Sequence, residues 1–233
     1  MSKVYRSEWK YYDYSVKLQE VSQRLSHIMP YDSHSPSGEY EIHSMYFDDY
    51  MNTCIKQNDA GIGIRSKWRI RYYNNDSDFL RLENKEKYNS FCHKRTCILT
   101  KSEYDDIVQG NPEKLFWETE KELLRVFCYK IIADGFHPAV IVNYSRKAFV
   151  EPMTNTRITF DKNVMASYDY DKFLDGEYCR IPVSDYNKEI LEVKFDEVLP
   201  SYIKNIVQAT QLDQQAYSKY VLSRKRMNSI FKV

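Results

Sequence analysis

The sequence predicts an α+β fold in which about eight antiparallel strands, interrupted by helices, form a barrel or a curled sheet. Apolar and polar residues alternate along many short segments, which is typical of strands with one buried face. Aromatic residues, which favour strands, make up 15% of the 233 residues and include 21 tyrosines. Only six glycines are present, and neither GxGxxG nor GxxxxGKS/T occurs, so a Rossmann or P-loop nucleotide site has no support.

The strands are predicted where this alternation runs between turn residues. They cover residues 6–12, 41–47, 67–73, 79–87, 94–99, 140–150, 156–161, 179–183 and 189–195. Residues 74–78 are typical of a hairpin loop, and residues 30–38 have the composition of a longer loop. No repeat or linker divides the chain, so we expect a single domain over residues 1–233.

Helices are predicted where apolar residues recur at helical spacing. The first covers residues 16–28, with Asp13 or Ser15 as its N-cap. A helical turn is expected at 50–56, and a short helix at 102–108 capped by Thr100 or Ser102. A longer helix begins at Pro112, continues through residue 131 and ends at Gly135. Pro200 opens a further helix, and residues 215–226 form the last one.

Charged residues gather on one face of six predicted strands, because residues i and i+2 point to the same side. These faces carry Arg6, Glu8 and Lys10; Lys67, Arg69 and Arg71; Arg81, Glu83, Lys85 and Lys87; Tyr144 and Arg146; Arg157 and Asp161; and Glu192 and Lys194. Each face on its own is compatible with a solvated sheet surface. Together they predict a basic interior if the sheet closes. A polyanion such as phosphate would neutralise such an interior, and a few carboxylates would hold a divalent metal.

These strands also carry a family likeness. The motifs are RSEWK (6–10), KWRIRYY (67–73), LENKEK (82–87), HKRTC (93–97), NYSRKAF (143–149), RITFD (157–161), LEVKF (191–195) and AYSKY (216–220). In this order and spacing, from about residue 5 to 225, the chain resembles the VTC domain. That domain is the polyphosphate polymerase module of the triphosphate tunnel metalloenzyme (CYTH-like) superfamily. The resemblance implies an eight-stranded antiparallel β-barrel, the triphosphate tunnel, with flanking helices and a C-terminal closing helix.

The resemblance also implies an activity and its residues. Such domains transfer the γ-phosphate of ATP to a growing polyphosphate chain with a divalent metal, Mn or Mg. The matching basic and polar positions are Arg69, Arg71, Arg146, Arg157 and Lys219 for catalysis, and Lys10, Lys85, Lys94, Tyr144 and Ser218 for phosphate binding. Glu192 matches the metal-binding glutamate, and Glu8 is either a second metal ligand or the partner of Lys10. One position departs from the family: Ala216 stands where a basic residue is expected in the closing helix.

Two other functions stay open. A tunnel triphosphatase would hydrolyse tripolyphosphate or a nucleoside triphosphate on the same scaffold, and it usually carries an ExExK first strand, where this chain has SEWK. A non-catalytic module would only bind polyphosphate. Nucleic acid is not expected as a partner, because the net charge is only +1.

The compartment is predicted from what the sequence lacks. No stretch approaches the roughly 20 apolar residues of a transmembrane helix, and the N-terminus does not resemble a signal peptide. The five cysteines show no CxxC spacing, which favours reduced thiols over a disulfide framework or a zinc site. We therefore expect a cytoplasmic protein without a membrane segment of its own; a membrane-associated partner is left open.

Overall fold

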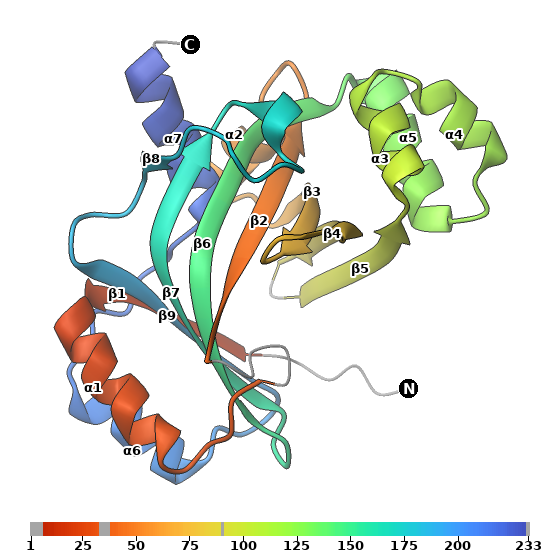
Figure 1. Ribbon diagram of the computed structural model, residues 1–233. Coiled ribbons are helices and arrows are strands. Elements are labelled where there is room, and N and C mark those ends of the chain that lie inside the picture. The colour runs from red at the N-terminus through yellow and green to blue at the C-terminus, as the bar shows by residue number, and fades with distance from the viewer. Residues whose placement is uncertain (1–6, 33–37, 90, 232–233) are drawn as a thin grey trace. The chain divides into compact units, whose positions relative to one another are not determined.

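The computed structural model describes residues 7–32, 38–89 and 91–231 of the chain (Figure 1). Arg6, predicted on the first strand, and part of the predicted loop at 30–38 lie outside these residues. The described residues form nine strands and seven α-helices. The strands are β1 (Ser7–Tyr14), β2 (Glu39–Asp48), β3 (Ile64–Tyr73), β4 (Asp76–Tyr88), β5 (Phe91–Leu99), β6 (His137–Glu151), β7 (Thr156–Ser167), β8 (Ile181–Pro182) and β9 (Lys188–Phe195). The helices are α1 (Ser15–Ser26), α2 (Thr53–Asp59), α3 (Lys101–Val108), α4 (Pro112–Glu118), α5 (Glu122–Asp134), α6 (Ser201–Ala209) and α7 (Lys219–Phe231).

The strand pairing confirms an α+β fold with a large antiparallel sheet but not the predicted closed barrel. Hydrogen-bonded neighbours follow the order β1-β9-β7-β6-β2-β3-β4-β5, and β8 pairs with β7. The order ends at β1 and at β5, so the sheet is not closed within the part of the chain that the structure describes. The nine strands overlap the nine segments predicted from the sequence, one more than the eight strands that the resemblance implies, and the segment predicted at 179–183 contains only the two-residue strand β8.

The chain divides into two compact units, each assembled from separate stretches of sequence. Unit 1 comprises the described residues of 1–41, 144–165 and 182–219. Unit 2 comprises those of 42–143, 166–181 and 220–233. The single domain expected from the sequence stays a prediction.

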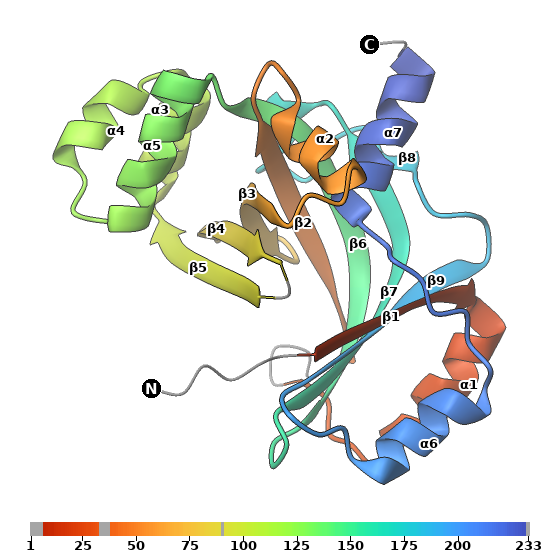
Figure 2. The same ribbon diagram turned by 180° about the vertical axis from the view of Figure 1, so that it is seen from behind.

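Unit 1 has a helix-covered face and a charged face. β9 lies between β1 and β7, with Glu192 opposite both Lys10 and Thr159. α1 and α6 lie side by side in both ribbon views (Figures 1 and 2). The buried core of this unit includes Leu18, Val21 and Leu25 from α1, Ile203 and Val207 from α6, and Ile158, Leu191 and Val193 from the strands. Because strand residues alternate between faces, the face opposite this core carries Glu8, Lys10, Arg157, Asp161, Glu192 and Lys194.

Unit 2 contains an antiparallel meander of β2, β3, β4 and β5. Trp68, Ile70 and Tyr72 on β3 are buried, and Trp68 stacks on Phe127 of α5 with ring centroids 5.1 Å apart. The helices α3, α4 and α5 lie together beyond the end of β5 (Figure 1). The predicted alternation along β3 is therefore confirmed, with the arginines on the face opposite this aromatic packing.

Several predicted helix ends are confirmed. Thr100 caps α3 with a full capping box, because its side chain accepts a hydrogen bond from the backbone N–H of Glu103 and the Glu103 carboxylate accepts one from the backbone N–H of Thr100. Gly135 ends α5 with a φ of 68°, the left-handed conformation that glycine adopts without strain.

Other helix predictions are wrong in position. Tyr14, rather than Asp13 or Ser15, is the N-cap of α1, and the Asp13 carboxylate instead accepts from Lys17. The helix predicted from Pro112 onward is two helices, since the chain turns at Thr119, whose hydroxyl accepts from the backbone of Lys121. The last helix begins at Lys219 rather than at residue 215.

The segment before α7 is extended because it hydrogen-bonds to the edge of β1. The backbone of Gln215 donates to the carbonyl of Lys10 at 3.0 Å, and Tyr12 donates to the carbonyl of Asp213 at 3.2 Å. Ala216 therefore lies outside the closing helix in which the sequence placed it.

Candidate functional site

A group of basic residues in unit 2 surrounds one buried carboxylate, and we call it the arginine cluster: Arg69, Arg71, Glu83 and Lys94. Arg69 on β3 lies directly opposite Glu83 on β4. The Arg69 Nε donates to Glu83 Oε2 at 2.6 Å, and Lys94 Nζ on β5 donates to Glu83 Oε1 at 2.6 Å. The Arg71 Nη1 is 3.9 Å from Glu83 Oε2. Three cations thus meet one carboxylate that is 1% exposed.

The electrostatics of this cluster keep Glu83 ionised. Burial pushes the pKa of Glu83 upward, but Arg69, Arg71 and Lys94 outweigh burial and hold this pKa well below its usual range. Within these contacts the cluster carries two more positive than negative charges. Such an excess suits an anionic ligand, and the forked guanidinium donors suit phosphate oxygens.

A second group lies in unit 1, and we call it the carboxylate cluster: Glu8, Lys10, Arg146, Asp161, Glu192, Lys194 and Lys219. Cross-strand neighbours here carry opposite charge, because Glu8 lies opposite Lys194 and Lys10 lies opposite Glu192. The Lys10 Nζ is 3.2 Å from Glu8 Oε1 and 3.6 Å from Glu192 Oε1. The Lys194 Nζ is 3.1 Å from Glu192 Oε1 and 3.7 Å from Glu8 Oε1. Two glutamates therefore share two lysines.

The same cluster continues to a fully buried aspartate. Asp161 accepts from Arg146 Nε at 2.6 Å and from Arg146 Nη2 at 2.7 Å, and Lys219 Nζ is 2.6 Å from its Oδ2. Burial raises the pKa of Asp161, but Arg146 and Lys219 outweigh it and hold this pKa below its usual range. The Arg146 Nη2 also lies 3.9 Å from Glu192 Oε2, which links Asp161 to the glutamates.

The remaining predicted residues lie beside these clusters. Lys85 is opposite Lys94 on one side and Lys67 on the other, so it adjoins the arginine cluster. The Tyr144 ring centroid is 5.3 Å from the Arg146 guanidinium carbon and 4.8 Å from Lys219 Nζ, a cation–π arrangement that places it in the carboxylate cluster. Ser218 directly precedes α7.

Arg157 has partners of its own. Its Nη2 is 2.6 Å from Asp32 Oδ2 and donates to the Tyr40 hydroxyl at 3.0 Å. It lies opposite Lys194 on β9, so it borders the carboxylate cluster without joining its ion pairs.

The residues present fit a divalent metal only in part. Among the described residues, no group of three or more His, Cys, Asp or Glu side chains could hold a metal ion. Glu8 and Glu192 do converge on the same two ammonium groups, which is consistent with both alternatives for Glu8, second ligand or lysine partner. Two carboxylates would suffice for Mg²⁺, which keeps waters and takes its other ligands from substrate phosphates.

Three charged residues of the clusters were not predicted as site residues: Glu83, Asp161 and Lys194. The period-two rule placed each of them on a basic face, so the signal was present in the sequence. Their roles depend on pairing register, which fixes that Glu83 meets Arg69 and that Lys194 meets Glu8. A single sequence does not specify that register.

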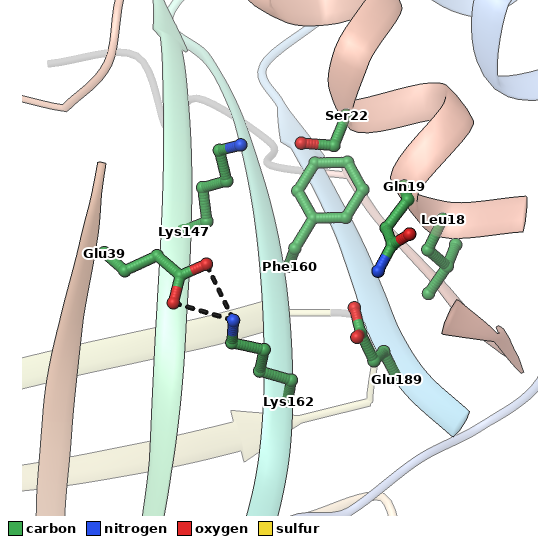
Figure 3. A pocket seen from close by; sticks show the side chains of 8 residues that line it. All are labelled: Leu18, Gln19, Ser22, Glu39, Lys147, Phe160, Lys162 and Glu189. Atoms are coloured by element: carbon green, nitrogen blue, oxygen red, sulfur yellow. Dashed lines mark hydrogen bonds and ion pairs between the residues drawn. The ribbon is translucent and has the colours of Figure 1, made fainter. Parts of the chain in front are cut away.

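Unit 1 also contains a pocket of about 100 Å³ (Figure 3). It is lined by Leu18, Gln19, Ser22, Glu39, Lys147, Phe160, Lys162 and Glu189. Figure 3 shows Lys162 bound to the Glu39 carboxylate, with an Nζ to Oε1 distance of 2.8 Å. Burial raises the pKa of Glu189. None of the predicted site residues lines this pocket, so it is not assigned to phosphate.

The helices give no sign of a membrane span. Within the described ranges, none of them is both long enough and apolar enough to cross a bilayer.

Comparison with known proteins identifies the family. No match was found among curated proteins. A crystal structure of a candidate adenylate cyclase from Bacillus halodurans is similar, with 13% identity, a TM-score of 0.54 and coverage of 92% of this chain and 95% of that one. The protein PH1819 from Pyrococcus horikoshii OT3 is also similar, with 13% identity, a TM-score of 0.50 and coverage of 95% and 99%. At this identity the likeness concerns the fold alone. The family model of the VTC domain matches residues 5–228, and the chain therefore belongs to the VTC domain family.

Proposed function

We propose that this VTC domain is a polyphosphate polymerase that transfers the γ-phosphoryl group of ATP to a growing polyphosphate chain. Family membership supports a triphosphate substrate. The single observation that carries the proposal is the arginine cluster, in which three cations converge on one carboxylate. The excess charge is suited to a ligand with several anionic phosphate groups.

The reaction needs positioning and charge neutralisation more than covalent chemistry. A terminal oxygen of the chain attacks the γ-phosphorus of ATP, the bond from that phosphorus to the β–γ bridging oxygen breaks, and ADP leaves. The chain becomes one phosphate longer, and no serine or cysteine nucleophile is required. In this proposal Arg69, Arg71 and Lys94 bind phosphate oxygens on which negative charge spreads during transfer.

The carboxylate cluster has a different composition and a different proposed role. Its four cations face three carboxylates, so within its ion pairs it carries only one excess positive charge. Lys10, Arg146 and Lys219 would bind phosphate there, and Glu8 and Glu192 would hold a divalent ion, Mn²⁺ or Mg²⁺. When bound, such an ion neutralises phosphate charge and orients the oxygens. Inorganic polyphosphate and ATP are the proposed partners.

The test is the product formed from ATP in the presence of Mn²⁺ or Mg²⁺. Gel separation of the products distinguishes long chains, free phosphate and unreacted ATP. Long chains are expected. If free phosphate is the only product, the domain is a tunnel triphosphatase and not a polymerase. If ATP stays unreacted while polyphosphate binds, the domain is a non-catalytic binding module.

Variants of both clusters connect the product to the site. Arg69→Ala and Arg71→Ala should each lower turnover by about a hundredfold, the loss typical of one electrostatic stabiliser. Glu192→Gln should lower turnover far more than ATP binding. Arg24→Ala and Glu20→Gln are matched controls, because this exposed ion pair lies on α1. If the Glu192→Gln variant turned over ATP at the wild-type rate, the assignment of Glu192 as a metal ligand would be wrong.

A further inference from the structure

One face of β2 is polar and buried, which the sequence patterns did not bring out. Ser44, Tyr46 and Asp48 alternate along this strand and therefore share one face. Their exposed fractions are 0%, 7% and 0%. Buried hydroxyl and carboxyl groups are costly without hydrogen-bond partners, so each of these side chains has to be matched by a neighbour.

The partners of the two hydroxyl groups are the arginines of the arginine cluster. Ser44 lies directly opposite Arg71, and Tyr46 lies directly opposite Arg69. The Arg71 Nε donates to Ser44 Oγ at 3.0 Å, and the Arg69 Nη1 donates to the Tyr46 hydroxyl at 2.8 Å. Register therefore assigns one hydroxyl to each guanidinium.

Glu83 on β4 contacts the same two guanidinium groups. This carboxylate accepts from Arg69 Nε at 2.6 Å and lies 3.9 Å from Arg71 Nη1. Arg69 is thus hydrogen-bonded both to a hydroxyl from β2 and to the carboxylate from β4, whereas Arg71 is hydrogen-bonded to its hydroxyl and forms a longer ion pair with the same carboxylate. A planar group fixed at two of its edges keeps one orientation, so little ordering is left to do when a ligand arrives.

The carboxylate of Glu83 and the hydroxyl groups of Ser44 and Tyr46 differ in charge, which matters for an anionic ligand. Glu83 orients the arginines and also cancels one positive charge. A hydroxyl accepts a hydrogen bond without adding charge, so Ser44 and Tyr46 orient the guanidinium groups and leave the charge excess of the cluster intact.

We propose that Ser44 and Tyr46 are positioning residues, each fixing the direction of one phosphate-binding arginine: Ser44 that of Arg71, and Tyr46 that of Arg69. The inference deepens the proposed function and rests on it for the identity of the ligand. The pairing itself is a property of the protein without ligand, so it can be measured separately.

The experiment is a set of four double-mutant cycles on the affinity for inorganic tripolyphosphate, measured by calorimetry. Tyr46→Phe and Ser44→Ala are each combined with Arg69→Lys and with Arg71→Lys. Each single hydroxyl deletion should weaken binding by about three- to tenfold, the range for one hydrogen bond. Coupling is expected only in the pairs that the register joins, Tyr46 with Arg69 and Ser44 with Arg71. Ser44→Thr, which keeps the hydroxyl, should restore affinity.

A ligand-free measurement separates this inference from the proposed function. The side-chain Nε–H signal of Arg71 in NMR spectra reports its bond to Ser44, so Ser44→Ala should speed its hydrogen exchange and Tyr46→Phe should not. If the wild-type protein does not bind tripolyphosphate, the proposed function fails while this signal still tests the pairing. Equal coupling in all four cycles, or an Arg71 signal that Ser44→Ala leaves unchanged, would overturn the positioning role.

Discussion

Asp161 accepts two hydrogen bonds from the guanidinium of Arg146, with Oδ1 2.6 Å from Nε and Oδ2 2.7 Å from Nη2. The family resemblance places Arg146 among the catalytic residues, yet a fully buried carboxylate already occupies this edge of its side chain. Lys219, at the start of α7, binds the same carboxylate. Asp161 therefore joins β6, β7 and the start of α7 in unit 1 through one ionised group.

The first prediction concerns the stability that Asp161 contributes. Asp161→Asn leaves Arg146 and Lys219 without their counter-charge, and breaking a buried ion pair in this way costs about 3–5 kcal/mol. The free energy of unfolding, measured with urea, should fall by this amount. Glu20→Gln, which removes an exposed partner of Arg24 on α1, should change it by less than about 1 kcal/mol. Equal small losses in the two variants would show that Asp161 is not the buried anchor described above.

The second prediction concerns the effect of low pH on the stabilising contribution of Glu83. The pKa of Glu83 lies below its usual value in the folded protein, so its stabilising contribution is complete above the unfolded pKa of about 4.3 and is lost as the pH falls below it. Glu83→Gln should therefore be less stable than the wild type at pH 7, and the difference should narrow steadily from about pH 4.5 downward. Urea unfolding at several pH values measures this difference. A gap that stays constant down to pH 3 would contradict the ionised, arginine-bound state of Glu83.

The third prediction concerns the five free cysteines. Cys92 and Cys179 are exposed, whereas burial raises the pKa of Cys97 and of Cys128 to about 11 and also raises that of the buried Cys54. The reactive species is the thiolate, so these three should react with a thiol reagent at pH 8 about a hundredfold more slowly than the exposed pair. The absorbance change of a chromogenic thiol reagent should show that two thiol groups per chain react in the fast phase. Cys92→Ser and Cys179→Ser should each remove one, and a third fast equivalent would contradict the raised pKa of the three remaining thiols.

The sequence anticipated the faces of the strands better than the contacts between them. Alternation along β3 correctly separated Arg69 and Arg71 from Trp68 and Ile70, because side-chain direction in a strand follows from position alone. Which charges meet across strands depends on register, and register follows from the packing of the whole unit. The contact of Lys10 with Glu8, two residues away on the same strand, was one of the two alternatives that the sequence offered for Glu8. The contact of Lys10 with Glu192 on β9 depends on the register and could not be predicted from the sequence.

Helix ends were anticipated where a local interaction sets them. The capping box at Thr100 and the glycine at 135 act within a few residues, and both predictions are confirmed. The start of α7 is set by distant residues, because Gln215 binds the backbone of Lys10 and so holds the preceding segment extended. Helical spacing alone placed that start four residues too early, at residue 215 instead of Lys219.

The assembly of unit 1 from three separated stretches has a consequence for synthesis on the ribosome. β1 pairs with β9, and Ser7 lies opposite Phe195. β1 can therefore join the sheet only after β9 has left the ribosome. The meander of β3, β4 and β5 joins neighbouring strands and can form while the chain is still growing. Non-local pairing is slow, and an unpaired strand edge is prone to aggregate. A growing chain therefore exposes the unpaired edge of β1 until β9 has been synthesised, so β1 is prone to aggregate during that interval.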